Sequence, residues 1–388
     1  MNSIKDNIKN IFNNVFLYNE TIKYHFNLPD AEPIENSNVQ SIKLDENKSV
    51  DTNLFKNMEY MKTIYNSMIN SDIVIRDFDL IIQDKIYKSF LIYIDGMADT
   101  KVINDFVLSP LMLRNKSNTY QSNPYMQTNK PNVRIRKSQK INIEDYIYNS
   151  LIPQNAIKKR KNFYDIVSDI NSGNSILFIN ELSVAFSIDA KGFKTRSISN
   201  PNNEVVVRGS QEAFVEAIRT NTSIIRRLVN NEDLIIENID VGKISKTKVA
   251  VCYLKNIASD DLVGEVKFRI NNLDIDSLLS SGQLEQLIQD DDSSFPQIIA
   301  TERPDKVVNH VFEGRVAILV NGSPYALVVP GVLVDFFSSS EDLNLKPQFA
   351  NILRIIRIIA AFFALLLPGI YISVSIYHQE LIPTPLLF

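Results

Sequence analysis

The sequence predicts an α/β (α+β) fold in which two similar subdomains, related by an internal duplication, precede a C-terminal transmembrane helix. Three segments of the first half recur in the same order in the second half. Residues 358–377 contain no Asp, Glu, Lys or Arg over 20 residues, which is the length of a transmembrane helix. We therefore divide the chain into a polar flexible N-terminal segment (1–50), a first subdomain (51–200), a second subdomain (201–323) and a membrane-associated segment (324–388).

The repeats rest on three matched pairs of segments with almost constant spacing. The pairs are 72–80 with 233–241, 93–99 with 253–259, and 173–180 with 314–321. The first two pairs keep offsets of 161 (233 minus 72) and 160 (253 minus 93) residues. One match between apolar strands would be weak, but three in order favour a duplicated unit. The predicted order in each unit is helix, strand, strand, helix, variable insert, helix and hairpin.

In the first unit, hydrophobic periodicity predicts the elements. They are a helix at 52–68, strands at 73–75 and 90–94, a helix through Val102 and Phe106, a helix at 163–170, and a hairpin of strands 176–179 and 184–188. The insert 113–143 has seven basic residues and no acidic one. A solvated loop is the favoured interpretation, and a basic arm that contacts anionic lipid or an acidic partner stays open.

The second unit opens with the stretch 204–227, around which the chain is organised. A β-branched run ends at Arg208 and Gly209, and the pattern then predicts a helix with Ser210 as its N-cap and acidic residues in its early turns. Asn221 lies on the apolar stripe, where a polar amide needs hydrogen bonds. An amphipathic helix is one interpretation. The other is a binding or interface site made of Arg208, Glu212, Glu216, Thr220, Asn221, Arg226 and Arg227.

The insert of the second unit, 274–294, is acidic and includes three adjacent Asp residues at 290–292. Their spacing differs from that of an EF-hand loop, so a solvated loop is favoured over a cation site. The apolar stretch 325–337 is interrupted by Pro330, Gly331 and Asp335, which suggests an interfacial or re-entrant element.

The apolar run 358–377 contains Pro368 near its middle, which predicts a kinked helix that packs against other membrane helices. Lys346, Arg354 and Arg357 precede the run, so the positive-inside rule predicts that the N-terminal domain is cytoplasmic. The alternative is a buried hairpin helix of a soluble protein.

Composition argues against several classes of function. A net charge of −4 gives no general attraction to nucleic acid. Three histidines and one cysteine argue against a Cys-based metal site, and no Gly-rich phosphate-binding loop is present. The sequence lacks GxSxG and HExxH motifs as well. We therefore expect a non-enzymatic protein with no cofactor and no metal.

Several motifs together resemble those of one family, from about residue 55 to the end. They are FLIYIDG (90–96), EVVVRGSQEAFVE (204–216), RTN (219–221), IRR (225–227), FPQ (295–297), TERPD (301–305), EGRVAI (313–318) and HQELIPTP (378–385). On these motifs the chain resembles the A subunit of GerA-type spore germinant receptors. The family's soluble domain is described as two α/β subdomains, in agreement with the duplication.

The resemblance implies a subunit of a nutrient-sensing receptor in the spore inner membrane, acting in assembly, signal transmission and the ion release that triggers germination. It implies a transporter-like B subunit, a lipoprotein C subunit and homo-oligomers as partners. Family members continue with more membrane helices after the HQELIPTP segment, so a chain ending at Phe388 is expected to be truncated in its membrane domain. We then expect Asn221→Leu to leave the fold intact and impair receptor output.

Two rival functions stay open. One is a ligand-binding module in which the paired subdomains hold a small molecule between them. The weaker one is a hydrolase in the acidic insert, which predicts divalent-cation binding at residues 290–292.

Overall fold

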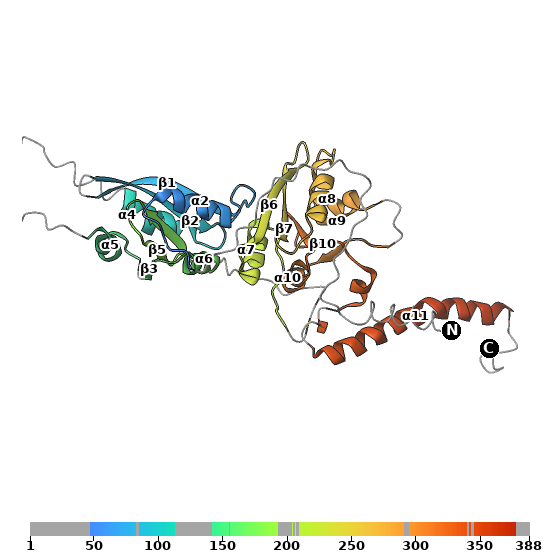
Figure 1. Cartoon of the computed structure of the whole chain (residues 1–388). Helices are drawn as coiled ribbons and strands as arrows, with labels where there is room; N and C mark the ends of the chain where they lie inside the picture. The colour runs from blue at the N-terminus through green and yellow to red at the C-terminus, as the bar shows by residue number, and fades with distance from the viewer. Residues whose placement is uncertain are drawn as a thin grey trace, which may run out of the picture.

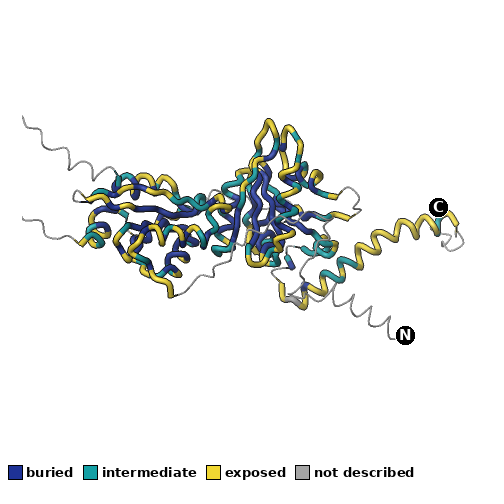
Figure 2. The backbone as a smooth tube through the Cα atoms, turned by 45° about the horizontal axis from the view of Figure 1, so that its top comes forward, coloured by how far each residue is buried: buried dark blue, intermediate teal, exposed yellow. Residues whose placement is uncertain are grey.

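The computed structural model describes residues 47–82, 85–112, 142–154, 156–192, 204, 206, 209–290, 295–339, 341–342 and 345–377. Two α/β units lie side by side, and a long helix, α11, projects from the second unit (Figure 1). Buried residues form a core in each unit, whereas most of α11 is exposed (Figure 2).

The first unit is built on one antiparallel sheet with the strand order β1-β2-β4-β5-β3. Its elements are α2 (Leu54–Ile64), β1 (Ile73–Ile82), β2 (Lys85–Ile94), α3 (Thr100–Val102), η1 (Ile103–Leu108), α4 (Ser109–Met112), α5 (Ile143–Tyr146), η3 (Ile147–Leu151), β3 (Ile157–Arg160), α6 (Phe163–Asn171), β4 (Ser175–Ile179) and β5 (Ala185–Ile188).

The second unit repeats this arrangement in a second antiparallel sheet, ordered β6-β7-β9-β10-β8. Its elements are α7 (Ile218–Val229), β6 (Leu234–Val241), β7 (Thr247–Leu254), α8 (Asp260–Asn271), α9 (Ser281–Ile288), β8 (Ile299–Thr301), α10 (Pro304–Phe312), β9 (Val316–Val320), β10 (Ala326–Val329) and η4 (Leu333–Phe337). In both sheets the five strands of the unit stand in the order first, second, fourth, fifth, third. The predicted α/β fold with an internal duplication is therefore confirmed.

Local contacts repeat as well. Leu54 N, at the start of α2, donates to Asn180 Oδ1 (3.3 Å), and Ile218 N, at the start of α7, donates to Asn321 Oδ1 (3.3 Å). In each unit, therefore, the residue after the fourth strand caps the first helix.

Each sheet has an apolar core on both faces, because alternate residues of a strand point to opposite sides. In β2, Phe90 and Ile92 pack with α2 and α6, whereas Leu91 and Tyr93 belong to the cluster on the other face. In the second sheet, α7 and α10 cover one face and α8 and α9 the other.

Two short strands were not predicted from the sequence. In β3 two exposed lysines break the apolar alternation, and β8 has only three residues. The acidic insert contains helix α9, and Asp290 pairs with Arg269. The basic insert and Asp291–Asp292 lie outside the described residues, except for Asn142 and Ile143.

The interfacial or re-entrant interpretation of residues 325–337 is wrong for its first half. Residues Ala326–Val329 form β10, which pairs with β9 and β8 and has a fully buried pattern. Its consecutive apolar residues reflect burial on both faces of the sheet. The second sheet therefore continues past the predicted boundary at residue 323.

Helix α11 (Pro347–Tyr377) contains the predicted span 358–377, and Pro368 lies inside it. Its segment Gln348–Tyr377 has a mean hydropathy of 2.3, and its most apolar part is not buried against the rest of the chain. By length and composition it is a candidate membrane span.

Candidate functional site: the junction between the two units

Helix α7 begins later than the pattern predicts. Its N-cap is Ala217, not Ser210. Glu212 and Glu216 therefore lie in the segment before the helix and not in its first turn. Acidic residues are favourable in the first turn of a helix, which is why the pattern predicts an earlier start. In the structure, tertiary contacts hold this segment in a non-helical conformation.

Those contacts join two of the motifs, EVVVRGSQEAFVE and TERPD. Glu204 N donates to Glu302 Oε1 (2.9 Å), and Thr301 Oγ1 donates to Glu204 Oε2 (2.6 Å). Further along, Phe214 N donates to the carbonyl oxygen of Glu302 (2.8 Å). This bond directs the Phe214 ring into the core with Ile225.

Arg303 lies at the centre of these contacts between the two motifs and is fully buried. Its Nη1 donates to the Glu204 carbonyl (3.0 Å), and its Nη2 donates to the Ser210 carbonyl (3.0 Å). A two-point ion pair with Asp305, at 3.1 and 2.6 Å, balances its charge. One guanidinium therefore fixes both ends of the segment 204–210.

Asn221 is fully buried, and both the oxygen and the nitrogen of its side-chain amide are hydrogen-bonded. Its Oδ1 accepts from Val215 N (2.8 Å), and its Nδ2 donates to Val215 O (2.6 Å). Asn57 of α2 makes the same two bonds with Asp51, at 2.9 and 2.6 Å. Both pairs are separated by six residues. The side-chain amide of Asn221 therefore has a structural role that Asn57 repeats. In each unit it closes the turn before the first helix.

We expect Asn221→Leu to lower the free energy of unfolding by about 1–3 kcal/mol, because it leaves both polar groups of Val215 without their partner. Thr220→Ala, at the neighbouring and half-buried position, is the control and should stay within about 0.5 kcal/mol of the parent. Urea unfolding measures both. Equal stability of the two variants would refute this structural role of Asn221.

Arg226, on another face of α7, reaches the first unit. It is fully buried, and Asp72, just before β1, is 2% exposed. The guanidinium donates to both carboxylate oxygens, Nε to Oδ2 at 3.0 Å and Nη2 to Oδ1 at 2.8 Å. Nη1 donates to Leu234 O (2.9 Å), and Nη2 also donates to Asn70 Oδ1 (3.2 Å). This is a desolvated, two-point ion pair between the units.

The residues before β1 also cover the free edge of β6. Ser71 N donates to Ile236 O (2.9 Å), and Ile236 N donates to Asn70 Oδ1 (3.1 Å). Asn238 N donates to Ser71 Oγ (3.1 Å). Asn70 Nδ2 also donates to Leu234 O (3.1 Å). An edge strand exposes unpaired backbone groups, and here the first unit bonds four of those on β6.

Three further contacts surround the ion pair. Asp95 pairs with Arg219 of α7, Lys255 Nζ donates to Asn66 Oδ1 (2.7 Å), and Asn171 Nδ2 donates to Glu232 Oε2 (3.3 Å). Gly96 lies against α7: a Cβ at this position would be 3.3 Å from Ser223 Cβ, and its φ of +84° also favours glycine.

Tyr65 lies beneath the junction and donates to Asn171 Oδ1 (3.0 Å). Burial, and then the charge of Glu232, raise its pKa well above the ordinary value. Tyr65 therefore stays a neutral hydrogen-bond donor.

Of the predicted site residues, Arg226 lies at the junction. Glu212 and Arg227 pair with each other on the second unit. Glu216 is exposed, although its carbonyl accepts from Gly322 N (2.8 Å), and Thr220 is half-buried. Arg208 lies outside the described residues. Sequence reasoning missed Asn70 and Asp72 as partners of Arg226. The available signal was an Asp directly before an apolar strand and an Arg within an apolar helix stripe.

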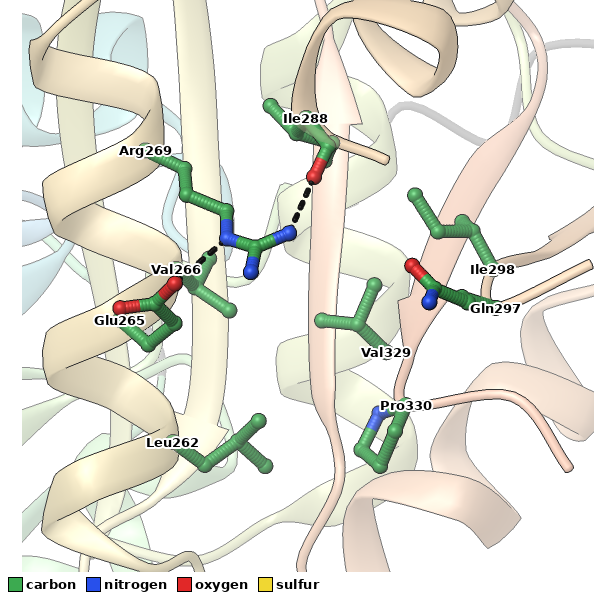
Figure 3. A pocket seen from close by; sticks show the side chains of 9 residues that line it. All are labelled: Leu262, Glu265, Val266, Arg269, Ile288, Gln297, Ile298, Val329 and Pro330. Atoms are coloured by element: carbon green, nitrogen blue, oxygen red, sulfur yellow. Dashed lines mark hydrogen bonds and ion pairs between the residues drawn. The ribbon is translucent and has the colours of Figure 1, made fainter. Parts of the chain in front are cut away.

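A pocket of about 40 Å³ lies within the second unit, not between the units (Figure 3). Leu262, Val266 and Arg269 of α8 form one wall, and Val329 and Pro330 form another. Arg269 is already bonded to Glu265 (2.6 Å) and to the Ile288 carbonyl (2.7 Å). The space suits one or a few water molecules and not a nutrient molecule.

The described residues suggest no reaction chemistry. No group of three or more His, Cys, Asp or Glu residues in this part of the chain is arranged to hold a metal ion. Burial raises the pKa of the Cys252 thiol to about 12, so it is not a reactive thiolate at neutral pH.

Comparisons with known proteins extend over most of the chain. The family described as Bacillus/Clostridium GerA spore germination protein matches residues 59–388. The chain is 32% identical to spore germination protein KA of Bacillus subtilis (strain 168) over 339 residues, which cover 87% of this chain and 58% of that protein. It is 40% identical to spore germination protein A1 of the same organism over 221 residues, which cover 57% of this chain and 46% of that protein.

A solved structure is similar as well. It is the crystal structure of the N-terminal domain of the A subunit of the Bacillus megaterium spore germinant receptor GerK3. The TM-score is 0.53 at 30% identity, and the match covers 74% of this chain and 98% of that one. The chain thus spans about half of the length of the two curated relatives and nearly all of the solved domain.

Proposed function

Because the chain belongs to the GerA family of spore germination proteins, we propose that it is an A-type subunit of a nutrient-sensing germinant receptor. Its role is non-enzymatic. The two α/β units assemble with other subunits and transmit the nutrient signal, and ion release through the assembled receptor triggers germination.

The buried pair of Arg226 and Asp72 carries this proposal. It joins the two units through charges that are 0% and 2% exposed, and the second unit continues into α11. A buried ion pair contributes little net stability but demands one geometry, because any other arrangement leaves a buried charge unpaired. A displacement imposed on the first unit is therefore passed to the second unit and to the membrane helix.

For location, we assign α11 to the spore inner membrane and both units to the cytoplasmic side. Lys346, Arg354 and Arg357 precede the apolar run, as the positive-inside rule requires of a cytoplasmic flank. The proposed partners are a transporter-like B subunit, a lipoprotein C subunit and further copies of this chain. The negative net charge gives no reason to include nucleic acid.

The alternative, a small-molecule site between the units, has weaker support. Arg226, Asp72 and Asn70 fill the described junction and are each at most 2% exposed. The nutrient is therefore assigned to another subunit.

Deletion of the gene in a spore former that lacks other germinant receptors tests the proposal. We expect the spores to lose their germination response to at least one nutrient, measured as the fall in optical density and the release of ions. The parent gene should restore it, Arg227→Met should restore it too, and Arg226→Met should not. Deletion spores that germinate like the parent with every nutrient would contradict the proposal.

A further inference from the structure

Helix η4 leads from the second sheet toward α11 and has two unlike faces. Leu333 and Phe336, three residues apart, are 50% and 45% exposed. Asp335 turns the other way, where its carboxylate bonds Arg315 Nη1 at 2.5 Å and Nη2 at 3.3 Å. Asp335 Oδ2 also accepts from Val332 N (2.9 Å). The helix is therefore fixed to the second unit by its polar face and presents its apolar face outward.

A second ion pair fixes the other end of this connection to α11. Arg357 bonds both oxygens of Asp342, at 2.7 and 2.5 Å, and donates to the Phe337 carbonyl at 2.8 Å. Burial alone would raise the pKa of Asp342, but hydrogen bonds from Arg357 and from Ser339 N hold it below the ordinary value. The pair is therefore charged at neutral pH.

These contacts fix the level of η4 along the membrane normal. The apolar segment Gln348–Tyr377 has 30 residues, about 45 Å of helix, whereas the hydrocarbon core is about 30 Å thick. When the helix stands along the membrane normal, about ten residues therefore lie outside the core. Arg357 is the last charged residue before the 20-residue apolar run, so the hydrocarbon boundary lies close to it. Since Arg357 holds Phe337 O, η4 lies at the same level.

The first turns of α11 also expose apolar side chains. Phe349, Ile352 and Ile356 are 60%, 53% and 54% exposed, and their spacing places them on one face of the helix. Ala350, by contrast, is buried and Arg357 turns to Asp342. We call Leu333, Phe336, Phe349, Ile352 and Ile356 the interfacial patch.

We propose that the interfacial patch lies in the head-group region of the bilayer that α11 crosses, so that the second unit rests directly on the membrane. The proposal rests on the assignment of α11 as a membrane span. Apolar side chains beside Lys346 and Arg354 suit an interface with anionic lipid, where apolar groups enter the acyl boundary and cations meet head groups. Three of its five residues lie on α11 directly before the apolar run, which favours lipid over a protein partner.

The chain contains no Trp, so single Trp substitutions report on one position each. We would reconstitute the full chain in vesicles of phosphatidylcholine and phosphatidylglycerol that carry bromine at a shallow or a deep acyl position. The variants are Phe336→Trp and Leu333→Trp in the patch and Leu367→Trp near the centre of the span. Ile244→Trp is the control: Ile244 is 78% exposed in the β6–β7 turn, at the opposite end of the second sheet from η4.

We expect blue-shifted emission from both patch variants and stronger quenching by shallow than by deep bromine. Leu367→Trp should be quenched most by deep bromine, and Ile244→Trp should be unaffected. If Leu367→Trp is quenched but both patch variants behave like Ile244→Trp, the interfacial contact is overturned, whereas α11 still spans the membrane. If the emission of the patch variants is blue-shifted but bromine does not quench it, a protein partner covers the patch, and the interfacial contact is overturned as well. No quenching of Leu367→Trp would remove the span and, with it, this inference.

Discussion

Replacing Arg226 with Met is expected to lower the free energy of unfolding by about 3–5 kcal/mol, because it leaves the carboxylate of Asp72 buried without its partner. The variant also removes one donor to Leu234 O and one donor to Asn70 Oδ1. Urea unfolding of residues 47–342 measures the loss. A part of this extent is reasonable, because the similar solved structure is that of an N-terminal domain.

Arg227→Met is the matched control on the next residue of the same helix. Arg227 and its partner Glu212 are about one-third exposed, with side-chain exposures of 29% and 31%, so the pair is worth at most about 1 kcal/mol. The double variant Arg226→Met with Asp72→Leu should recover much of the lost stability, since an apolar pair needs no charge compensation. If Arg226→Met is no less stable than Arg227→Met, the buried pair does not hold the junction.

Replacing Arg303 with Met is expected to lower the free energy of unfolding by about 3–5 kcal/mol as well. Arg303 is fully buried and holds the carbonyls of Glu204 and Ser210 as well as Asp305. Its loss frees the segment before α7, so exchange of the Phe214 amide hydrogen, which is bonded to Glu302 O, should accelerate strongly.

Lys306→Met is the control for Arg303→Met, because the Lys306 side chain makes one polar contact with the described residues, from Nζ to Glu204 Oε1 at 3.2 Å, and the backbone bond from Lys306 N to Asp305 is kept. We expect it to lose at most about 1 kcal/mol and to leave the Phe214 amide protected. Unchanged protection of this amide in Arg303→Met would show that the segment 204–214 is held by other contacts.

The parts of the fold that the sequence predicted are those with strong local patterns. The duplication follows from three matched segments, the first helix of each unit from apolar residues at helical spacing, and α11 from an uninterrupted apolar run. The sequence of strand β10 suggests an interfacial element because a strand buried on both faces and an interfacial segment have the same apolar composition. Strand β3, with its two lysines, carries almost no local signal and forms by pairing with β5.

At the junction, too, only features with a local sequence pattern could be predicted. That Asn221 must be hydrogen-bonded followed from its place on an apolar stripe, but its partner Val215 and the matching Asn57 became visible only in the structure. The partner of Arg226 lies 154 residues away in the chain. No local pattern identifies such a pairing, since it arises only when two folded units meet.

The most direct test of the central claim is the distance between the two units, measured by pulsed electron paramagnetic resonance. Phe55→Cys and Phe268→Cys place one spin label on each unit, at positions 69% and 61% exposed. Cys252 is buried with its pKa raised to about 12, and so stays unlabelled. We predict a single narrow distance distribution in the parent and a broad one when Arg226→Met is added. An equally narrow distribution in the Arg226→Met variant would contradict the claim that the buried ion pair fixes the two units relative to each other.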